Sequence, residues 1–188
     1  MNTNLTQLVM MVCCMSLTVF TMPAQAEKAD KQKPALIEAD SSKHDELKQA
    51  QVFEGNVVLN KGTLSLKADR IEANTDAQGF QYIKAIGSAT KLVQFRQKRE
   101  GVNEWMEGES VTLDFDGKAD TVLLGQKAMM KKLAGTVMQD EVRGETILYA
   151  NQTEVYTVKG GANSAATGGR VKAIIMPKEL VTNTTSKP

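Results

Sequence analysis

Cysteine, aromatic residues and excess charge of one sign are all scarce in this 188-residue chain. The two cysteines, Cys13 and Cys14, both lie in the first apolar stretch, so the rest of the chain has no disulfide, thiol nucleophile or cysteine metal site. Aromatic residues make up 5% of the chain, too few for a surface on which bases stack. The 23 basic and 22 acidic residues give a net charge of +1, which argues further against nucleic acid as a partner.

Groups that could carry out catalysis are equally sparse. The only histidine, His44, lies in a short polar run whose sequence neighbours lack the geometry of a catalytic triad, so we interpret it as a surface residue. The carboxylate pairs Glu107/Glu109 and Asp114/Asp116 have the two-residue spacing of one strand face and flank apolar residues, which indicates a solvated face. The sequence therefore predicts a binding or structural protein and not an enzyme, with no metal site and no cofactor.

Residues 1–26 have the pattern of a secretory signal peptide. Leu5–Phe20 is mostly apolar, and Ala24–Ala26 has the small-x-small pattern that signal peptidase accepts, although no Lys or Arg precedes Leu5. We expect cleavage after Ala26 and export of residues 27–188. The alternative is an uncleaved membrane anchor, for which the apolar run is shorter than the roughly 20 residues of a spanning helix.

The exported part divides into a charged, flexible lead-in at residues 27–33, one domain at residues 34–181 and a flexible tail at residues 182–188. Apolar and polar residues alternate repeatedly within the domain, as at Val57/Leu59, Leu64/Leu66/Ala68, Val111/Leu113/Phe115, Ile147/Tyr149 and Val171/Ala173/Ile175. This period of two is typical of half-buried strands. Residues 122–133 could be scanned as a helix, but Gly125 interrupts them, and the β-branched and apolar run Thr121–Leu124 favours a strand. The expected fold class is all-β, with many short antiparallel strands.

An internal repeat supports this fold class. Each copy has a small residue, two polar residues and a β-branched residue, then a polar turn and a second strand that ends at a glycine. The three copies begin at Ala68–Ile71, Gly108–Val111 and Gly144–Ile147 and end at Gly87, Gly125 and Gly160. Because a hairpin with one apolar face cannot bury that face alone, stacked copies would build one continuous apolar interior.

Two short motifs carry a family resemblance. Phe53–Val58 reads Phe-Glu-Gly-Asn-Val-Val and Leu66–Asp69 reads Leu-Lys-Ala-Asp, and this combination resembles the signature of the OstA/LptA family of periplasmic lipopolysaccharide-transport proteins. Supporting matches lie at residues 37–40, 87–90, 95–97, 107–110, 113–115, 144–149 and 171–177, so the resemblance covers about residues 34–181. Ser88 departs from the family, which often has proline there, and residues 91–94 lengthen that segment.

The resemblance implies an antiparallel β-jellyroll, open at both ends, whose strands form a V-shaped groove with an apolar interior. Proteins of this family bind lipopolysaccharide through the acyl chains of lipid A and carry it through the periplasm. They form a bridge between an inner-membrane-anchored partner and an outer-membrane translocon, and they associate end to end through edge strands. No cofactor is implied.

The resemblance, combined with the strand pattern, selects candidate residues. Those expected to contact acyl chains are Ala35, Ile37, Phe95, Leu113 and Phe115. Those expected at the assembly edges are Ile37, Val171, Ala173 and Ile175. Two alternatives remain open at this point: the membrane-anchored partner of the same transport system, which shares the fold, and an envelope structural module that binds no lipid.

Overall fold

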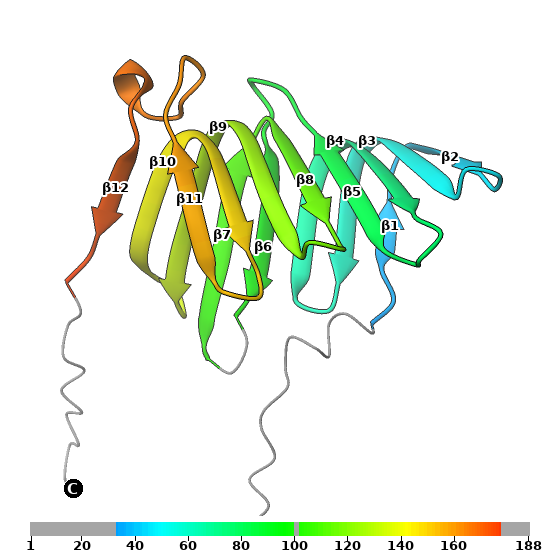
Figure 1. The fold of residues 1–188 in the computed structure, drawn as a ribbon, viewed down its shortest axis with the longest axis horizontal. Helices are drawn as coiled ribbons and strands as arrows, with labels where there is room; N and C mark the ends of the chain where they lie inside the picture. The colour runs from blue at the N-terminus through cyan, green and yellow to red at the C-terminus, as the bar shows by residue number, and fades with distance from the viewer. Residues whose placement is uncertain (1–32, 100–101, 178–188) are drawn as a thin grey trace, which may run out of the picture.

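The computed structural model describes residues 33–99 and 102–177 (Figure 1). The expected signal peptide, nearly all of the lead-in and the tail lie outside these residues, so their boundaries stay predictions. Within the described ranges, no helix is long and apolar enough to cross a membrane.

The described chain folds into twelve strands that pair in antiparallel fashion. They are β1 (Leu36–Glu38), β2 (Ser41–Asp45), β3 (Ala50–Lys61), β4 (Leu64–Thr75), β5 (Gln81–Ile86), β6 (Val93–Lys98), β7 (Glu104–Ser110), β8 (Thr112–Asp116), β9 (Thr121–Ala134), β10 (Val137–Ala150), β11 (Val155–Lys159) and β12 (Lys172–Ile175). One short 3-10 turn, Thr167–Gly169, precedes β12. The strand interpretation of residues 122–133 is confirmed by β9.

The strands build two walls that share four long strands. The first wall has the order β1-β3-β4-β6-β7-β9-β10-β12, and the second wall has the order β2-β3-β4-β5-β8-β9-β10-β11. Because β3, β4, β9 and β10 run through both walls, the sheet folds back on itself along one line, which we call the corner. The hairpin turns lie at the opposite ends of the strands and outline the open edge, which we call the mouth.

Left-handed backbone bends two of the shared strands at the corner. Gly55 and Asn56 have φ angles of 82° and 46° in β3, and Gln126 and Lys127 have φ angles of 59° and 51° in β9. Extra residues of this kind form bulges, which bend a strand and strengthen its twist. At Gly55, a Cβ atom would lie 2.2 Å from Oδ2 of Asp40, so glycine is required for space as well as for conformation.

The inward-facing residues of both walls line up in rows that run from one end of the molecule to the other. On the first wall the paired residues are Ile37, Leu59, Leu66, Phe95, Gly108, Met130, Val142 and Ala173. On the second wall they are Ser42, Phe53, Ile71, Ala85, Leu113, Leu124, Ile147 and Val158. Directly opposed residues of neighbouring strands share a face, so each row is one continuous strip of the interior.

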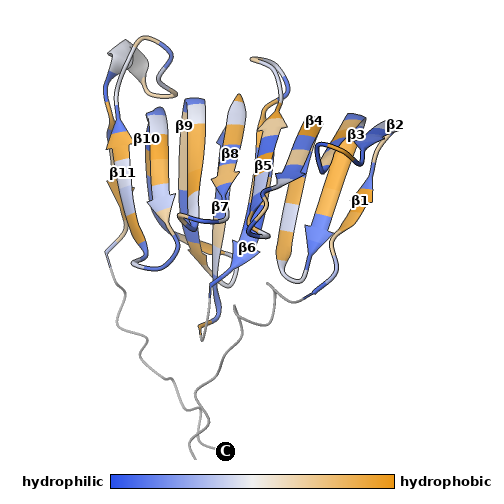
Figure 2. Ribbon diagram, turned by 45° about the vertical axis from the view of Figure 1, so that its right-hand side comes forward, coloured by the Kyte–Doolittle hydropathy of each residue, from blue (hydrophilic) through white to orange (hydrophobic). Residues whose placement is uncertain are grey.

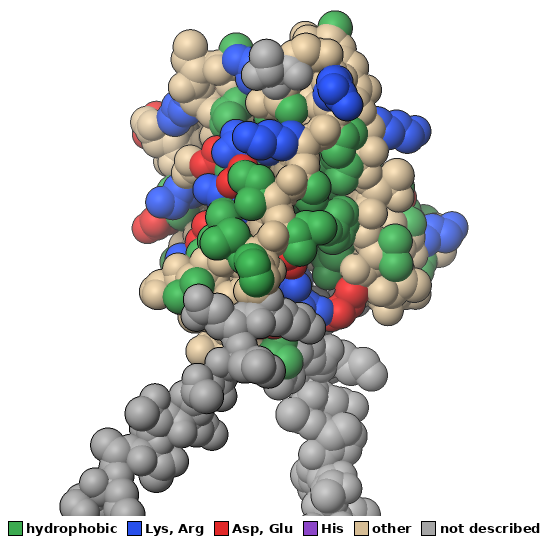
Figure 3. Space-filling view, turned by 90° about the vertical axis from the view of Figure 1, so that its left-hand side faces the viewer, with side chains coloured by type: hydrophobic (Ala, Val, Ile, Leu, Met, Phe, Trp, Pro, Cys, Tyr) green, Lys and Arg blue, Asp and Glu red, His purple; other side chains and the backbone are tan. Residues whose placement is uncertain are grey.

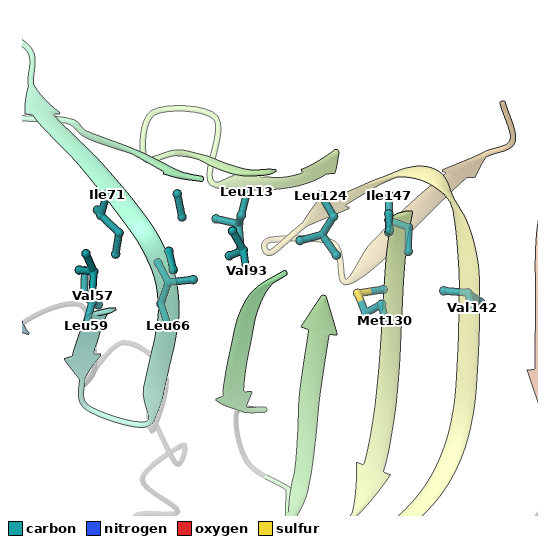
Figure 4. Packing of buried hydrophobic residues seen from close by; sticks show 13 residues of the cluster. Val57, Leu59, Leu66, Ile71, Val93, Leu113, Leu124, Met130, Val142 and Ile147 are labelled. Carbon is teal, nitrogen blue, oxygen red and sulfur yellow. The ribbon is translucent and has the colours of Figure 1, made fainter. Parts of the chain in front are cut away.

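The core lies where the two walls meet. Ile71 and Ile147 are 0% exposed and Leu124 is 1% exposed. Figure 4 shows side chains of the two walls directed into the space between them, and Figure 2 shows the alternation of apolar and polar residues along the strands. The predicted alternation is confirmed at Val57/Leu59, Leu64/Leu66/Ala68, Leu113/Phe115 and Ile147/Tyr149, because all of these side chains are buried in this core or packed against it.

Two details of the sequence interpretation are wrong. Val111 was expected to begin a strand in phase with Leu113, but it lies between β7 and β8 at the corner, where its N–H donates to Gln126. In the repeat, Val111 aligns with Ile71 and Ile147, but in the second-wall row it is Leu113, and not Val111, that lies level with those two residues. Val171 was expected in the last strand, but β12 begins one residue later at Lys172.

Candidate functional site

The space between the walls is an apolar groove that opens at the mouth. It holds about 1290 Å³, the part open to solvent included. Leu59, Leu66 and Met130 line it from the first wall, and Ile83 and Val122 line it from the second wall. No charged side chain belongs to the rows at the base of this groove, so the site can accommodate an elongated apolar ligand.

The five residues expected to contact acyl chains all belong to the inner face. Ala35, Phe95, Leu113 and Phe115 line the groove. Ile37 pairs with Leu59 in the first-wall row and packs, partly buried, against the core. The structure thus places Ile37 and Phe95 on the inner face of the first wall and Leu113 and Phe115 on the inner face of the second, on opposite sides of the same groove.

Several groove residues were missed by sequence reasoning. Met106, Met130 and Tyr149 line the groove, yet none was selected in advance. At Met129–Met130 two apolar residues follow each other, so alternation does not say which one faces inward. Both are buried, although Met129 lies on the opposite face of β9 from Met130. Tyr149 was recognised as a strand residue, and its pairing with Val122 is what places it in the groove.

Gly108 is the only row residue of the first wall without a side chain, and the ring of Phe95 fills the place. A Cβ atom at Gly108 would lie 2.0 Å from Cε1 and 2.8 Å from Cζ of Phe95. The two residues are directly opposed across β6 and β7. The glycine therefore lets the ring lie against the wall, where it leaves the groove open.

Charged side chains surround the mouth. Lys61 and Lys98 line its first-wall side, and Glu154 lies in the turn between β10 and β11 on the second wall. Arg99 donates hydrogen bonds to Glu104 and to Glu154. Partial burial alone would lower the pKa of Arg99, but the hydrogen bonds and negative charges of the two carboxylates outweigh it and raise that pKa above its usual value.

The outer face of the first wall is charged where the inner face is apolar. Arg96, Glu107, Lys131 and Glu141 are opposed in sequence across β6, β7, β9 and β10, so that positive and negative charges alternate. Nη1 of Arg96 lies 3.1 Å from Oε1 of Glu107. The hydrogen bond from Arg143 lowers the pKa of Glu141, against the opposing effect of burial. Along this row the first wall is charged on its outer face, whereas the neighbouring inward-facing row is apolar.

Both ends of the molecule present strand edges. Among the described strands, β1 and β2 each pair only with β3 at one end, and β11 and β12 each pair only with β10 at the other. Figure 3 looks onto the second of these ends and shows apolar side chains gathered in a hollow. Ile175 is 78% exposed there. Over residues 33–99 and 102–177, no group of three or more His, Cys, Asp or Glu side chains could hold a metal ion.

Comparison with known proteins agrees with this architecture. The family model described as LptA/(LptD N-terminal domain) LPS transport protein matches residues 36–155. The chain belongs to this family. Lipopolysaccharide export system protein LptA of Escherichia coli (strain K12) is 24% identical over 174 residues, which are 90% of this chain and 85% of that protein. Lipopolysaccharide export system protein LptH of Pseudomonas aeruginosa is 23% identical over 158 residues, 83% of this chain and 86% of that one.

A solved structure supports the fold. The crystal structure of LptH, described as the LptA-homologous periplasmic component of the conserved lipopolysaccharide transport device of Pseudomonas aeruginosa, superposes with a TM-score of 0.67 at 21% identity. The match covers 79% of this chain and 99% of that one. The expected family and the expected open β-jellyroll are both confirmed.

Proposed function

We propose that this lipopolysaccharide-transport family member is a periplasmic carrier that binds lipopolysaccharide in its groove and passes it from the inner to the outer membrane. The observation that carries this proposal is the pair of largely apolar rows, each of which runs along its wall from one end strand to the other. Family membership and the names of the relatives, which are lipopolysaccharide export proteins, support the choice of cargo.

The groove suits the acyl chains of lipid A. Burial of an alkyl chain contributes about 0.8 kcal/mol for each CH₂ group, so partial coverage of several chains is enough to hold one molecule. Ala35, Ile37, Phe95, Leu113 and Phe115 would contact these chains. The phosphorylated sugars would stay at the mouth, where Lys61 lines the groove.

Photo-crosslinking along β8 tests the cargo directly. A photoreactive amino acid at Phe115 faces the groove, whereas one at the adjacent Asp114 faces the other side of the same strand and is the matched control. We expect lipopolysaccharide adducts at position 115 and none at position 114. Equal adducts at both positions, or none at either, would contradict binding in the groove.

A substitution at the same residue tests the consequence. Phe115→Asp places a carboxylate in the apolar groove, where an unpaired charge is costly to bury. We expect the folded variant to lose the lipopolysaccharide that co-purifies with the wild type, with circular dichroism as the check on folding. A folded Phe115→Asp protein that carries lipopolysaccharide as the wild type does would contradict the assignment.

We also propose that units associate end to end and dock in the same way onto the inner-membrane-anchored partner and the outer-membrane translocon. Within residues 33–99 and 102–177, β1 and β12 each pair with a strand on one side only, and edges with unpaired backbone groups can add further strands. Ile37, Ala173 and Ile175 lie on these strands, and Val171 lies directly before β12. A head-to-tail contact of this kind does not close, so it yields chains whose length depends on concentration.

Light scattering over a concentration series tests assembly. Truncation after Gly169 removes β12 but uncovers the edge of β10, so Ile175→Lys is the cleaner variant: it places a charge on an exposed edge and leaves β10 covered. We expect shorter chains for Ile175→Lys than for the wild type at equal concentration. A constant monomer mass for the wild type would refute the association.

Two alternatives are separated by simple measurements. The intact mass of the protein from the periplasmic fraction distinguishes a soluble carrier that begins at Glu27 from a membrane-anchored partner that keeps residues 1–26. Lipopolysaccharide that co-purifies with the folded protein distinguishes a carrier from an envelope structural module that binds no lipid.

A further inference from the structure

One ion pair joins the two walls across the mouth. Arg99 extends the β6–β7 pairing, because its N–H donates to the carbonyl of Glu104 on the same wall. Its guanidinium also donates to Glu154, which lies 55 residues away in the β10–β11 turn of the second wall. Among the ion pairs of residues 33–99 and 102–177, this Arg99–Glu154 bridge is the one that spans the mouth.

The bridge lies where two cavities meet. Beside the main groove is a smaller cavity of about 500 Å³, its open part included, which lies toward the β11 and β12 end and is lined by Asp140, Val142 and Tyr156. Arg99 and Glu154 line both cavities. An extended ligand that moves from the main groove to the smaller cavity therefore passes the Arg99–Glu154 bridge.

We propose that the Arg99–Glu154 bridge controls the passage of an acyl chain from the main groove to the cavity at the β11 and β12 end. This inference rests on the proposed function, because it concerns the movement of the same cargo. The bridge narrows the mouth when it is formed, and it lets the two walls move apart when it opens.

The contacts of Arg99 make the bridge easy to open. When Glu154 leaves, the guanidinium keeps its second carboxylate, Glu104, and so is not left unpaired. The side chain of Glu154 is already 49% exposed, so water can solvate the released carboxylate. Ion pairs with this exposure are weak and are screened by salt. The bridge can therefore hold the walls together without trapping the ligand.

Two single substitutions separate the bridge from its neighbour. Glu154→Gln removes the ion pair across the mouth and leaves Arg99 paired on its own wall. Glu104→Gln is the matched control, because it removes the ion pair within the first wall and leaves the Arg99–Glu154 bridge. The readout is the rate at which fluorescently labelled lipopolysaccharide moves from the protein to phospholipid vesicles, measured at low and high salt.

We expect Glu154→Gln to speed transfer about two- to fivefold at low salt, the range that corresponds to one exposed ion pair. The wild-type rate should rise with salt, since salt weakens the bridge, whereas the Glu154→Gln rate should not. Glu104→Gln should keep the salt response of the wild type. A Glu154→Gln protein with the rate and the salt response of the wild type would overturn the inference.

A second measurement needs no lipid. Spin labels on cysteines introduced at the exposed positions Asn103 and Gln152 of residues 27–188, which contain no cysteine of their own, report the separation of the walls at the mouth. Glu154→Gln should broaden and lengthen the distance distribution, and Glu104→Gln should not. An unchanged distribution would show that the bridge does not hold the walls. A wild-type protein that binds no lipopolysaccharide would instead overturn the proposed function, and the transfer role with it.

Discussion

Substitution of Gly108 tests how the first wall keeps the groove open. In Gly108→Ala, the new methyl group would lie 2.0 Å from Cε1 of Phe95, well inside contact distance. The backbone of Gly108 is not left-handed, so alanine meets no conformational penalty there. The ring of Phe95 must therefore leave its place against the wall and rotate into the groove.

The cost follows from that displacement. An extra methyl group in a packed interior typically destabilises a protein by about 1–3 kcal/mol. The partial exposure of Phe95 lets its ring move, so we expect about 1–2 kcal/mol for Gly108→Ala, within that range. In a Phe95→Ala background the new methyl group meets no ring. There, replacement of glycine by alanine in a strand should raise the free energy of unfolding by roughly 0.5 kcal/mol.

Urea denaturation of the four proteins of this double-mutant cycle measures the effect, with the fluorescence of Trp105, the only tryptophan, as the signal. The expected coupling between Gly108→Ala and Phe95→Ala is at least about 1 kcal/mol. If Gly108→Ala costs the same in both backgrounds to within about 0.5 kcal/mol, the two sites are independent and the contact with the ring does not explain the glycine.

Two further predictions concern stability. In urea denaturation, Leu124→Ala should lower the free energy of unfolding by about 2–5 kcal/mol, whereas the adjacent Leu123→Ala should lower it by under about 1 kcal/mol. The reason is that the side chain of Leu124 is 1% exposed and that of Leu123 is 38% exposed. Equal losses for the two variants would contradict the assignment of the inner face. The pKa of Glu141 is lowered in the folded state, so its ionised carboxylate stabilises the fold. This stabilisation is fully present at pH values above 4.5, the ordinary pKa of a glutamate, and is lost as the pH falls through the lowered pKa. Glu141→Gln should therefore be less stable than the wild type at pH 7 and lose less stability on acidification, and parallel acid profiles would contradict this.

Sequence alone was sufficient for the fold class, the family and the direction of most side chains. Alternation identifies a buried face wherever apolar and polar residues take turns, as at Leu113 and Phe115, because the period of a strand is two. It is uninformative at Met129–Met130, where both faces of β9 are covered, and it fails at Val111, where the corner interrupts the period. The Arg99–Glu154 bridge joins residues 55 positions apart, and only the arrangement of the two walls brings them together.

The repeat has a geometric origin that the pairings explain. Each copy is a hairpin of the second wall: its first strand runs from the corner to the mouth, and its second strand returns to the corner and ends at a glycine. The three hairpins are β4–β5, which ends at Gly87, β8–β9, which reaches Gly125, and β10–β11, which ends at Gly160. At Gly87 a Cβ atom would lie 2.5 Å from the carbonyl oxygen of Lys91, and at Gly160 it would lie 2.4 Å from the carbonyl oxygen of Gly169, so the close approach of chains requires glycine at both positions. Since each hairpin covers only its neighbours, such a stack has no closing member. The same pattern that builds the apolar interior therefore leaves both ends open, which suits a carrier whose cargo has to enter at one end and leave at the other.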